Sequence, residues 1–270
     1  MMLDVVARDG LVLLGCGKMG TALLTGWLQA GVPASSVWVI EPSPTDWLVS
    51  TGVHLNAALP VKTAVAVVAV KPQMMGAALP ALQALGNGTT LFLSIAAGTP
   101  IAAFAAALGA QTPIVRAMPN TPAMVGRGIT GICGNRHAGP TGLALARSLM
   151  QAVGQVVDLD DEAQIDAVTA VSGSGPAYVF HLIEAMAAAG EAEGLPPAIA
   201  MQLARATVCG AGELAYQACE TATQLRINVT SPGGTTAAAL AHLMDPATGL
   251  PPLMRRAVHA AAERGRELGK

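Results

Sequence analysis

Leu11-Val12-Leu13-Leu14-Gly15-Cys16-Gly17-Lys18-Met19-Gly20 is the stretch that decides the fold of this 270-residue chain. Four apolar residues run into the pattern Gly-x-Gly-x-x-Gly, and a helical pattern follows. In a Rossmann unit the first glycine (Gly15) permits a tight turn, the second (Gly17) lets the chain approach a pyrophosphate, and the third (Gly20) allows close helix–strand packing. The stretch therefore predicts a dinucleotide-binding domain.

A second predicted strand supports this interpretation. It covers residues 36–40 and ends at Glu41, about twenty residues beyond the glycines, where an acidic side chain can bind ribose hydroxyls. The alternative is a glycine turn with a purely structural role, and the position of Glu41 favours dinucleotide binding over that alternative.

Strand-like and helix-like segments alternate through the rest of the first half. The predicted strands are residues 64–70, 90–95 and 114–118, the predicted helices are residues 73–85 and 101–108, and residues 128–134 and 153–159 are expected to add edge strands. Apolar runs without polar alternation are typical of strands covered on both faces. The pattern predicts an α/β fold with a doubly wound, mainly parallel sheet over residues 1–159.

The second half has a different texture, because it is rich in alanine and has helical periodicity. Helices are predicted over residues 161–171, 176–193, 197–218, 235–243 and 251–268. We expect an all-helical domain over residues 160–270. Its broad apolar faces exceed what so small a domain can bury, so it is also expected to form a homo-oligomer.

Composition argues against several classes of protein. The net charge is −2, the 15 Lys and Arg residues are scattered, and there are only three Trp, two Tyr and three Phe, so nucleic-acid binding is not expected. Polar and helix-breaking residues divide the uncharged segment 72–115, so no membrane span is predicted.

Four well-separated cysteines predict free thiols and no metal site. Early charges at Asp4, Arg8 and Asp9 do not fit a secretion signal, and a cytoplasmic location is expected.

Ligands of a doubly wound sheet bind beyond the carboxyl ends of its strands, where this sequence places glycine, proline and small polar residues. Besides the three glycines, the predicted cofactor contacts are Lys18, Met19, Glu41, Val70, Lys71, Pro72, Ala96, Ala97, Gly98 and Asn120. Two of them have open alternatives. Lys71 either reaches cofactor oxygens or is an ordinary exposed cation, and Asn120 either orients a nicotinamide amide or caps a turn.

The run Asn228 to Thr236, Asn-Val-Thr-Ser-Pro-Gly-Gly-Thr-Thr, interrupts the helical half. Hydroxyls and adjacent glycines before a helix suit an anion site at the helix N-terminus. The alternative is a Ser/Thr-rich N-cap after a turn. Ser172-Gly173-Ser174-Gly175-Pro176 precedes another helix and allows the same two interpretations. Together the two loops predict a pocket for a small acid between helix N-termini.

The scarcity of acid–base side chains also indicates which kind of reduction the protein catalyses. Reduction of a ketone needs a proton donor, yet no lysine lies between Lys71 and Lys270, and the five histidines stand alone. A C=N bond can enter already protonated and needs mainly a hydrogen bond to its nitrogen, which a threonine hydroxyl can supply. The sequence favours an imine reductase over a ketone reductase.

Six ordered motifs resemble the delta-1-pyrroline-5-carboxylate reductase family, whose members reduce a cyclic imine to L-proline with NADPH or NADH. The motifs are residues 15–20, 69–73, 94–98, 116–122, 172–178 and 229–236, and the resemblance spans the whole chain. It implies that the hydroxyl of Thr236 bonds the ring nitrogen and that the N–H groups of Gly234, Thr235 and Thr236 hold the carboxylate. It further implies that Ser231, Ser174 and Glu220 belong to the substrate site and that Ser43 and Asn56 lie on the adenosine side.

The resemblance also implies a homodimer that forms through the helical domain. Such dimers can assemble further into a ring, up to a decamer. Cofactor choice is where this chain departs from members that favour NADPH. No Lys or Arg lies between Ala30 and Lys62, and Glu41 would repel a 2′-phosphate, so use of NADH is expected.

Two other functions remain open from the sequence. One is a related two-domain imine or hydroxyacid reductase, and the missing lysine of the helical half argues against the hydroxyacid enzyme. The other is a nucleotide-sensing protein without catalysis, and the intact loop at residues 231–236 argues against it.

Overall fold

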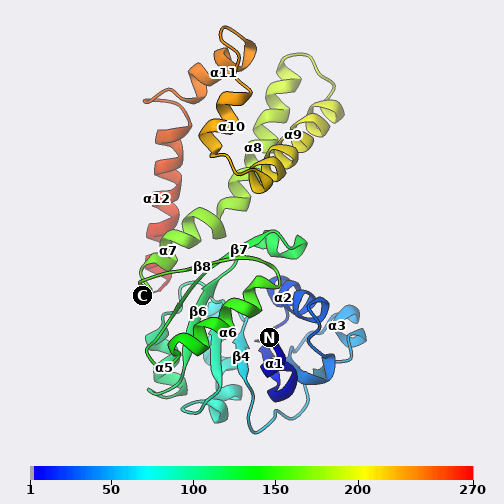
Figure 1. Ribbon diagram of the computed structural model, residues 1–270, viewed down its shortest axis with the longest axis vertical. Helices are drawn as coiled ribbons and strands as arrows, with labels where there is room; N and C mark the ends of the chain where they lie inside the picture. The colour runs from blue at the N-terminus through cyan, green and yellow to red at the C-terminus, as the bar shows by residue number, and fades with distance from the viewer. Residues whose placement is uncertain (1–2, 270) are drawn as a thin grey trace. The chain divides into compact units, whose positions relative to one another are not determined.

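The computed structural model describes residues 3–269 (Figure 1). Packing divides the chain into two units. The sheet unit contains the residues up to 173 together with those from 261 onward, and the helical unit contains residues 174–260. The domain boundary expected between residues 159 and 160 stays a prediction.

The described strands of the sheet unit form one eight-stranded sheet in the order β3-β2-β1-β4-β5-β6-β7-β8. Their bounds are β1 Leu11–Leu14, β2 Val37–Ile40, β3 His54–Leu55, β4 Val65–Val68, β5 Leu91–Ser94, β6 Ile114–Met118, β7 Gly128–Gly134 and β8 Gly154–Asp158. Among these strands only the β6–β7 pairing is antiparallel. The expected doubly wound, mainly parallel sheet with added strands at its edge is confirmed.

Helices cover both faces of this sheet, which is why its strands are apolar at nearly every position. One face is covered by α1 (Leu3–Asp9), α2 (Lys18–Gln29) and α6 (Gly139–Gln151) (Figure 1). Side chains such as Leu13 and Leu149 form the core between them and the sheet. The other face packs against α4 (Met75–Ala78), the 3-10 segment η3 (Leu79–Leu85) and α5 (Ile101–Leu108). Successive residues of β1 point to opposite faces, so Leu13 belongs to the first core and Leu14 to the second.

Trp27 ties α2 to the end of α6. Its indole is fully buried, and Nε1 donates to the carbonyl of Leu149 at 2.9 Å, one of the last-turn carbonyls that α6 cannot pair internally. Trp38 on β2 instead stacks on His54 with ring centroids 4.5 Å apart.

We expect Trp27→Phe to lower the free energy of unfolding by about 2 kcal/mol, because a buried carbonyl loses its donor and a cavity opens. Urea denaturation followed by far-UV circular dichroism measures the change. Trp47→Phe is the matched control, because the Trp47 side chain on α3 (Asp46–Ser50) is exposed, and it should change stability little. An equal loss in both variants would contradict the role of the Leu149 bond.

Several helix predictions need correction. Residues 73–85 are mostly 3-10 helix, with η2 (Pro72–Met74) before α4 and η3 after it, since Pro80 lacks the N–H that a continuous α-helix needs. The helix predicted at 161–171 begins later, as α7 (Gln164–Val168), and passes into a π-helical segment, η5 (Thr169–Gly173). Helices α1, α3, α6 and α10 (Ala222–Asn228) were not predicted at all.

The helical unit contains α8 (Gly175–Ala192), α9 (Pro197–Gln217), α10, α11 (Thr235–Leu243) and most of α12 (Leu250–Leu268). Its only buried hydrophobic side chains among the described residues are Ala187, Ala200 and Ala204, where α8 packs on α9. Large apolar side chains such as Phe180, Leu203 and Leu214 are exposed. None of the described helices is both long enough and apolar enough to cross a membrane.

Candidate functional site

The glycine turn after β1 has the steric features that a dinucleotide loop requires. Gly15 adopts φ +88°, and a Cβ on Gly20 would lie 2.6 Å from the Gly15 carbonyl oxygen, so the fold itself demands glycine at both positions. Gly17 differs, because an added Cβ would meet no described atom within 4 Å. The room beside Gly17, the N-cap of α2, fits a phosphate group against the first-turn N–H groups of that helix.

A cavity of about 460 Å³ opens at the carboxyl ends of β1, β2 and β4. The predicted residues that line it are Gly15, Gly17, Glu41, Asn56, Val70 and Lys71. The predicted residues Lys18, Met19, Gly20, Ser43, Pro72, Ala96, Ala97, Gly98 and Asn120 lie outside its lining. Met74, Ala77, Ala78 and Ala81 complete one wall and were missed, although their alanine-rich pattern just after Lys71 was a usable signal.

Glu41 is held rigidly at the mouth of this cavity. Its Oε2 accepts the N–H of Cys16 at 2.8 Å, and its Oε1 accepts the N–H of Ser43 at 3.0 Å. Asn56 fixes the backbone of Glu41 from the other side, since its amide oxygen accepts the Glu41 N–H and its amide nitrogen donates to the Glu41 carbonyl, both at 2.9 Å. The carboxylate therefore keeps its place beside the glycine turn and retains lone pairs for hydroxyl donors.

Lys71 and Asn120, which had open alternatives, occupy different surroundings. Lys71 is exposed at the end of β4 and lines the cavity, as cofactor contact requires. Asn120 is only 8% exposed, and its side-chain oxygen accepts the N–H of Ile129 at 2.9 Å. Asn120 thus has a clear structural function at the start of β7, and its contact with a nicotinamide stays a prediction.

The loop before α11 presents unused donors. The N-cap of α11 is Gly234, without a side-chain hydrogen bond, and Gly233 before it adopts φ +70°. Within residues 3–269 no hydrogen bond engages the hydroxyls of Ser231, Thr235 or Thr236. The alternative of a Ser/Thr cap is therefore wrong here. The first-turn N–H groups and the hydroxyls are available to a ligand such as a carboxylate.

Two other predicted substrate contacts have unexpected local structure. The segment 172–176 is not an open loop, because the π-helical η5 leads into α8 with Ser174 in helical conformation. Its N–H groups are less accessible than a free helix start would make them, and the prediction of a second loop of donors is wrong in that respect. Glu220 is exposed in the bend between α9 and α10.

The two buried thiols and the acidic clusters of the described residues offer no alternative chemistry. Burial raises the pKa of the Cys16 thiol, and burial together with the Glu162 carboxylate raises the pKa of Cys133 to about 11, so neither is a nucleophile at neutral pH. In the described part of the chain no group of three or more His, Cys, Asp or Glu side chains could hold a metal ion.

Comparison with known proteins follows the same division of the chain. Pyrroline-5-carboxylate reductase from Pseudomonas aeruginosa is 40% identical over 266 residues, which is 96% of this chain and 97% of that protein. The chain belongs to the pyrroline-5-carboxylate reductase family. The Mycobacterium tuberculosis pyrroline-5-carboxylate reductase is 39% identical over 298 aligned residues, covering 99% of this chain and 98% of that one.

Family models and solved structures agree with this assignment. Residues 162–268 match the model described as pyrroline-5-carboxylate reductase dimerisation, and residues 11–98 match NADP oxidoreductase coenzyme F420-dependent. The Coxiella burnetii pyrroline-5-carboxylate reductase has a TM-score of 0.90 at 35% identity, over 97% of this chain and 99% of that one. The Plasmodium falciparum enzyme with NADP bound has a TM-score of 0.82 at 29% identity, over 97% and 99%.

These matches confirm the predicted family, the fold class and a nicotinamide-dinucleotide domain. They also confirm that the helical part contains the dimerisation region of pyrroline-5-carboxylate reductases. The roles of individual site residues stay predictions.

Proposed function

We propose that this protein is a pyrroline-5-carboxylate reductase, which transfers a hydride from NADH or NADPH to the C=N bond of 1-pyrroline-5-carboxylate and forms L-proline. Membership of the family supports the reaction. The observation that carries the proposal is the start of α11, where backbone donors and hydroxyls without partners among residues 3–269 match the carboxylate and ring nitrogen of a small cyclic imino acid.

The cofactor would be held by the sheet unit. The first turn of α2 receives the pyrophosphate, Glu41 accepts hydrogen bonds from ribose hydroxyls, and Lys71 offers a positive charge along the cavity wall. When bound, the dinucleotide supplies the hydride.

The substrate would be held by the helical unit. The N–H groups of Thr235 and Thr236 are assigned to the carboxylate, together with that of Gly234, which donates to the Ser231 carbonyl at 3.0 Å and would exchange this bond for one to the ligand. Ser231, Ser174 and Glu220 are assigned to the surroundings of the ring. The hydroxyl of Thr236 accepts a hydrogen bond from the protonated imine and donates one to the nitrogen lone pair that forms as the ring is reduced. No stronger acid or base is needed, because the proton arrives with the imine.

Hydride transfer requires the two bound ligands to approach to about 3–3.5 Å. In the active enzyme the bound dinucleotide and the bound imine must therefore meet, whichever protomers supply them. A crystal structure with a proline analogue and the dinucleotide bound would test this, and ligands in two separate clefts of the oligomer would overturn it.

The function is tested by the loss of nicotinamide absorbance with pyrroline-5-carboxylate and each reduced cofactor. We expect turnover with this imine, and faster turnover with NADH than with NADPH at equal low concentrations because of Glu41. Absence of imine-dependent oxidation with both cofactors would refute the proposed reaction. A strong preference for NADPH would refute the proposed role of Glu41 only.

The helical unit indicates self-association, and we propose a homodimer through it that can assemble further, up to a decamer. Exposed apolar side chains on α8, α9 and α12 would form the interface between the two protomers. Sedimentation at micromolar concentration should show a species at least twice the 27.1 kDa chain mass. A single 27 kDa species would contradict the dimer.

We also propose a cytoplasmic location, on the basis of the four unpaired cysteines.

A further inference from the structure

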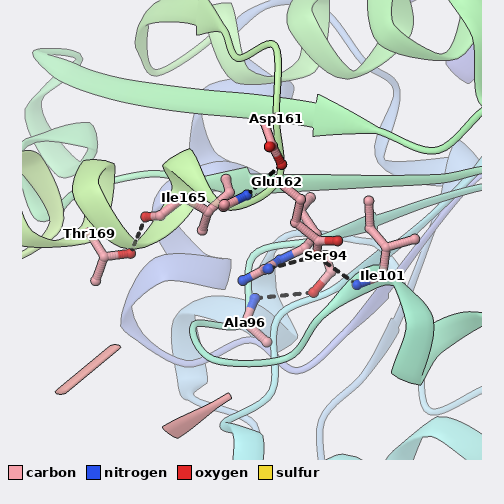
Figure 2. A network of polar contacts seen from close by, with 9 residues as sticks. Ser94, Ala96, Ile101, Asp161, Glu162, Ile165 and Thr169 are labelled. Carbon is pink, nitrogen blue, oxygen red and sulfur yellow. Dashed lines mark hydrogen bonds and ion pairs between the residues drawn. The ribbon is translucent and has the colours of Figure 1, made fainter. Parts of the chain in front are cut away.

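The loop between β5 and α5 carries Ala96, Ala97 and Gly98, three of the predicted cofactor contacts, and it is tightly built. Ser94 Oγ accepts the N–H of Ala96 at 3.2 Å (Figure 2). Gly98 adopts φ +70°. Any movement of the end of β5 or of the start of α5 would therefore displace this loop. Both ends depend on one carboxylate, that of Glu162.

Glu162 provides the cap that α5 lacks. The N-cap residue of α5 is Pro100, which makes no side-chain hydrogen bond, and the first turn contains no acidic residue. Oε1 of Glu162 accepts the N–H of Ile101 at 2.8 Å, from 61 residues away in the sequence (Figure 2). A negative charge at this helix start also interacts favourably with the positive end of the helix dipole.

The same oxygen pairs with Arg116 on the strand beside the loop. Arg116 is only 6% exposed, its Nη1 lies 2.7 Å from Glu162 Oε1, and it is the Cα partner of Ser94 in the β5–β6 register. A buried guanidinium without its carboxylate is strongly unfavourable. Removal of the charge on Glu162 would therefore disturb the strand position from which the loop begins.

The last turn of α12 packs on the loop from another side. A Cβ built on Gly98 would lie 3.2 Å from both Cβ and the carbonyl oxygen of Leu268, so the two backbones are in close contact. The segment that matches the dimerisation family model runs from residue 162 to residue 268. Both ends of that segment thus contact the loop or the start of the helix that follows it.

We infer that Glu162 is a positioning residue for the dinucleotide, fixing the loop of Ala96, Ala97 and Gly98 through Arg116 and the start of α5. This inference rests on the proposed function. It concerns cofactor binding and leaves the imine contacts at α11 untouched. Loss of the carboxylate charge should therefore weaken dinucleotide binding more than it slows turnover of the loaded enzyme.

The test variant is Glu162→Gln, which keeps the size of the side chain and one acceptor oxygen but has no charge. We expect the Kd for NADH, measured by calorimetry on the full chain without imine, and the KM for NADH to rise about ten-fold. The KM for pyrroline-5-carboxylate and kcat at saturating NADH should change less than about three-fold. Glu162→Asp should recover part of the lost affinity.

Asp158→Asn is the matched control, because Asp158 also pairs with an arginine of the sheet unit, Arg147, but on exposed β8. It should bind NADH as the unaltered protein does. A purely structural role for Glu162 would reduce the active fraction and leave the Kd and KM for NADH unchanged, and that result would overturn the inference.

If Glu162→Gln does not fold, Arg116→Gln with Glu162→Gln removes both charges and leaves no buried ion without a partner. This double variant should again bind NADH about ten-fold more weakly, and native affinity would overturn the inference. An unaltered protein that binds NADH but does not reduce the imine would refute the proposed function alone. Failure to bind either dinucleotide would refute both.

Discussion

Replacement of Thr236 by alanine is expected to lower kcat with pyrroline-5-carboxylate by about 10²-fold, the usual cost of losing one hydrogen bond that strengthens as charge develops at the reacting atom. Thr236 is the second residue of α11 and is half-buried, and no described residue accepts or donates a bond to its hydroxyl. Its loss should therefore affect the reaction and not the fold. Initial rates at saturating cofactor measure the effect.

Two further variants separate the hydroxyl from the general shape of the loop. Thr236→Ser keeps the hydroxyl and should retain most of the activity. Thr223→Ala removes an exposed threonine hydroxyl from α10 and should leave kcat as it was. Thermal unfolding should be similar in all three variants, since alanine is well tolerated in a helix. Unchanged turnover in Thr236→Ala would remove this residue from the mechanism.

Glu41→Gln is expected to change the cofactor preference. Two unit charges about 4 Å apart repel by about 4 kcal/mol at an effective dielectric constant of 20, and solvent and salt at this half-buried position reduce that to about 1–2 kcal/mol. The ratio of kcat/KM for NADH to kcat/KM for NADPH should therefore fall about ten-fold when the charge is removed. Steady-state rates with each cofactor give the ratio.

The rigid setting of Glu41 makes this effect predictable. Bonds from the Cys16 and Ser43 N–H groups, and the two bonds from Asn56 to its backbone, keep the carboxylate from turning away from a 2′-phosphate. Asp46→Asn, an exposed carboxylate nearby in α3, is the charge-matched control and should keep the original ratio. If both variants shifted the ratio equally, net charge rather than position would be responsible.

The nucleotide-binding half could be predicted from sequence in considerable detail. Glycine patterns and uninterrupted apolar strands are local signals, so the turn at Gly15, the close packing at Gly20 and the doubly wound, mainly parallel sheet followed from short stretches. The helix at residues 73–85 was predicted with the wrong geometry, because helical periodicity does not reveal where Pro80 tightens the chain into 3-10 turns.

The clamp of Asn56 on Glu41 and the capping of α5 by Glu162 could not be predicted. Each joins residues far apart in sequence, 15 positions in the first case and 61 in the second, through side-chain contacts that leave no periodic pattern. Arg116 offered the one hint, as a lone charge in the middle of an apolar strand. The π-helical segment η5 before α8 was likewise hidden, since Ser and Gly at 172–175 have the composition of a loop.

Aromatic side chains divide between the two units in a way that makes the protein convenient to study in solution. Trp27, Trp38 and Trp47 all belong to the sheet unit, whereas Tyr178 and Tyr216 belong to the helical unit. Intrinsic tryptophan emission therefore reports on the sheet unit alone, whereas ellipticity reports on the helices of both units. Fluorescence and ellipticity recorded on one sample would show in which order the two units melt.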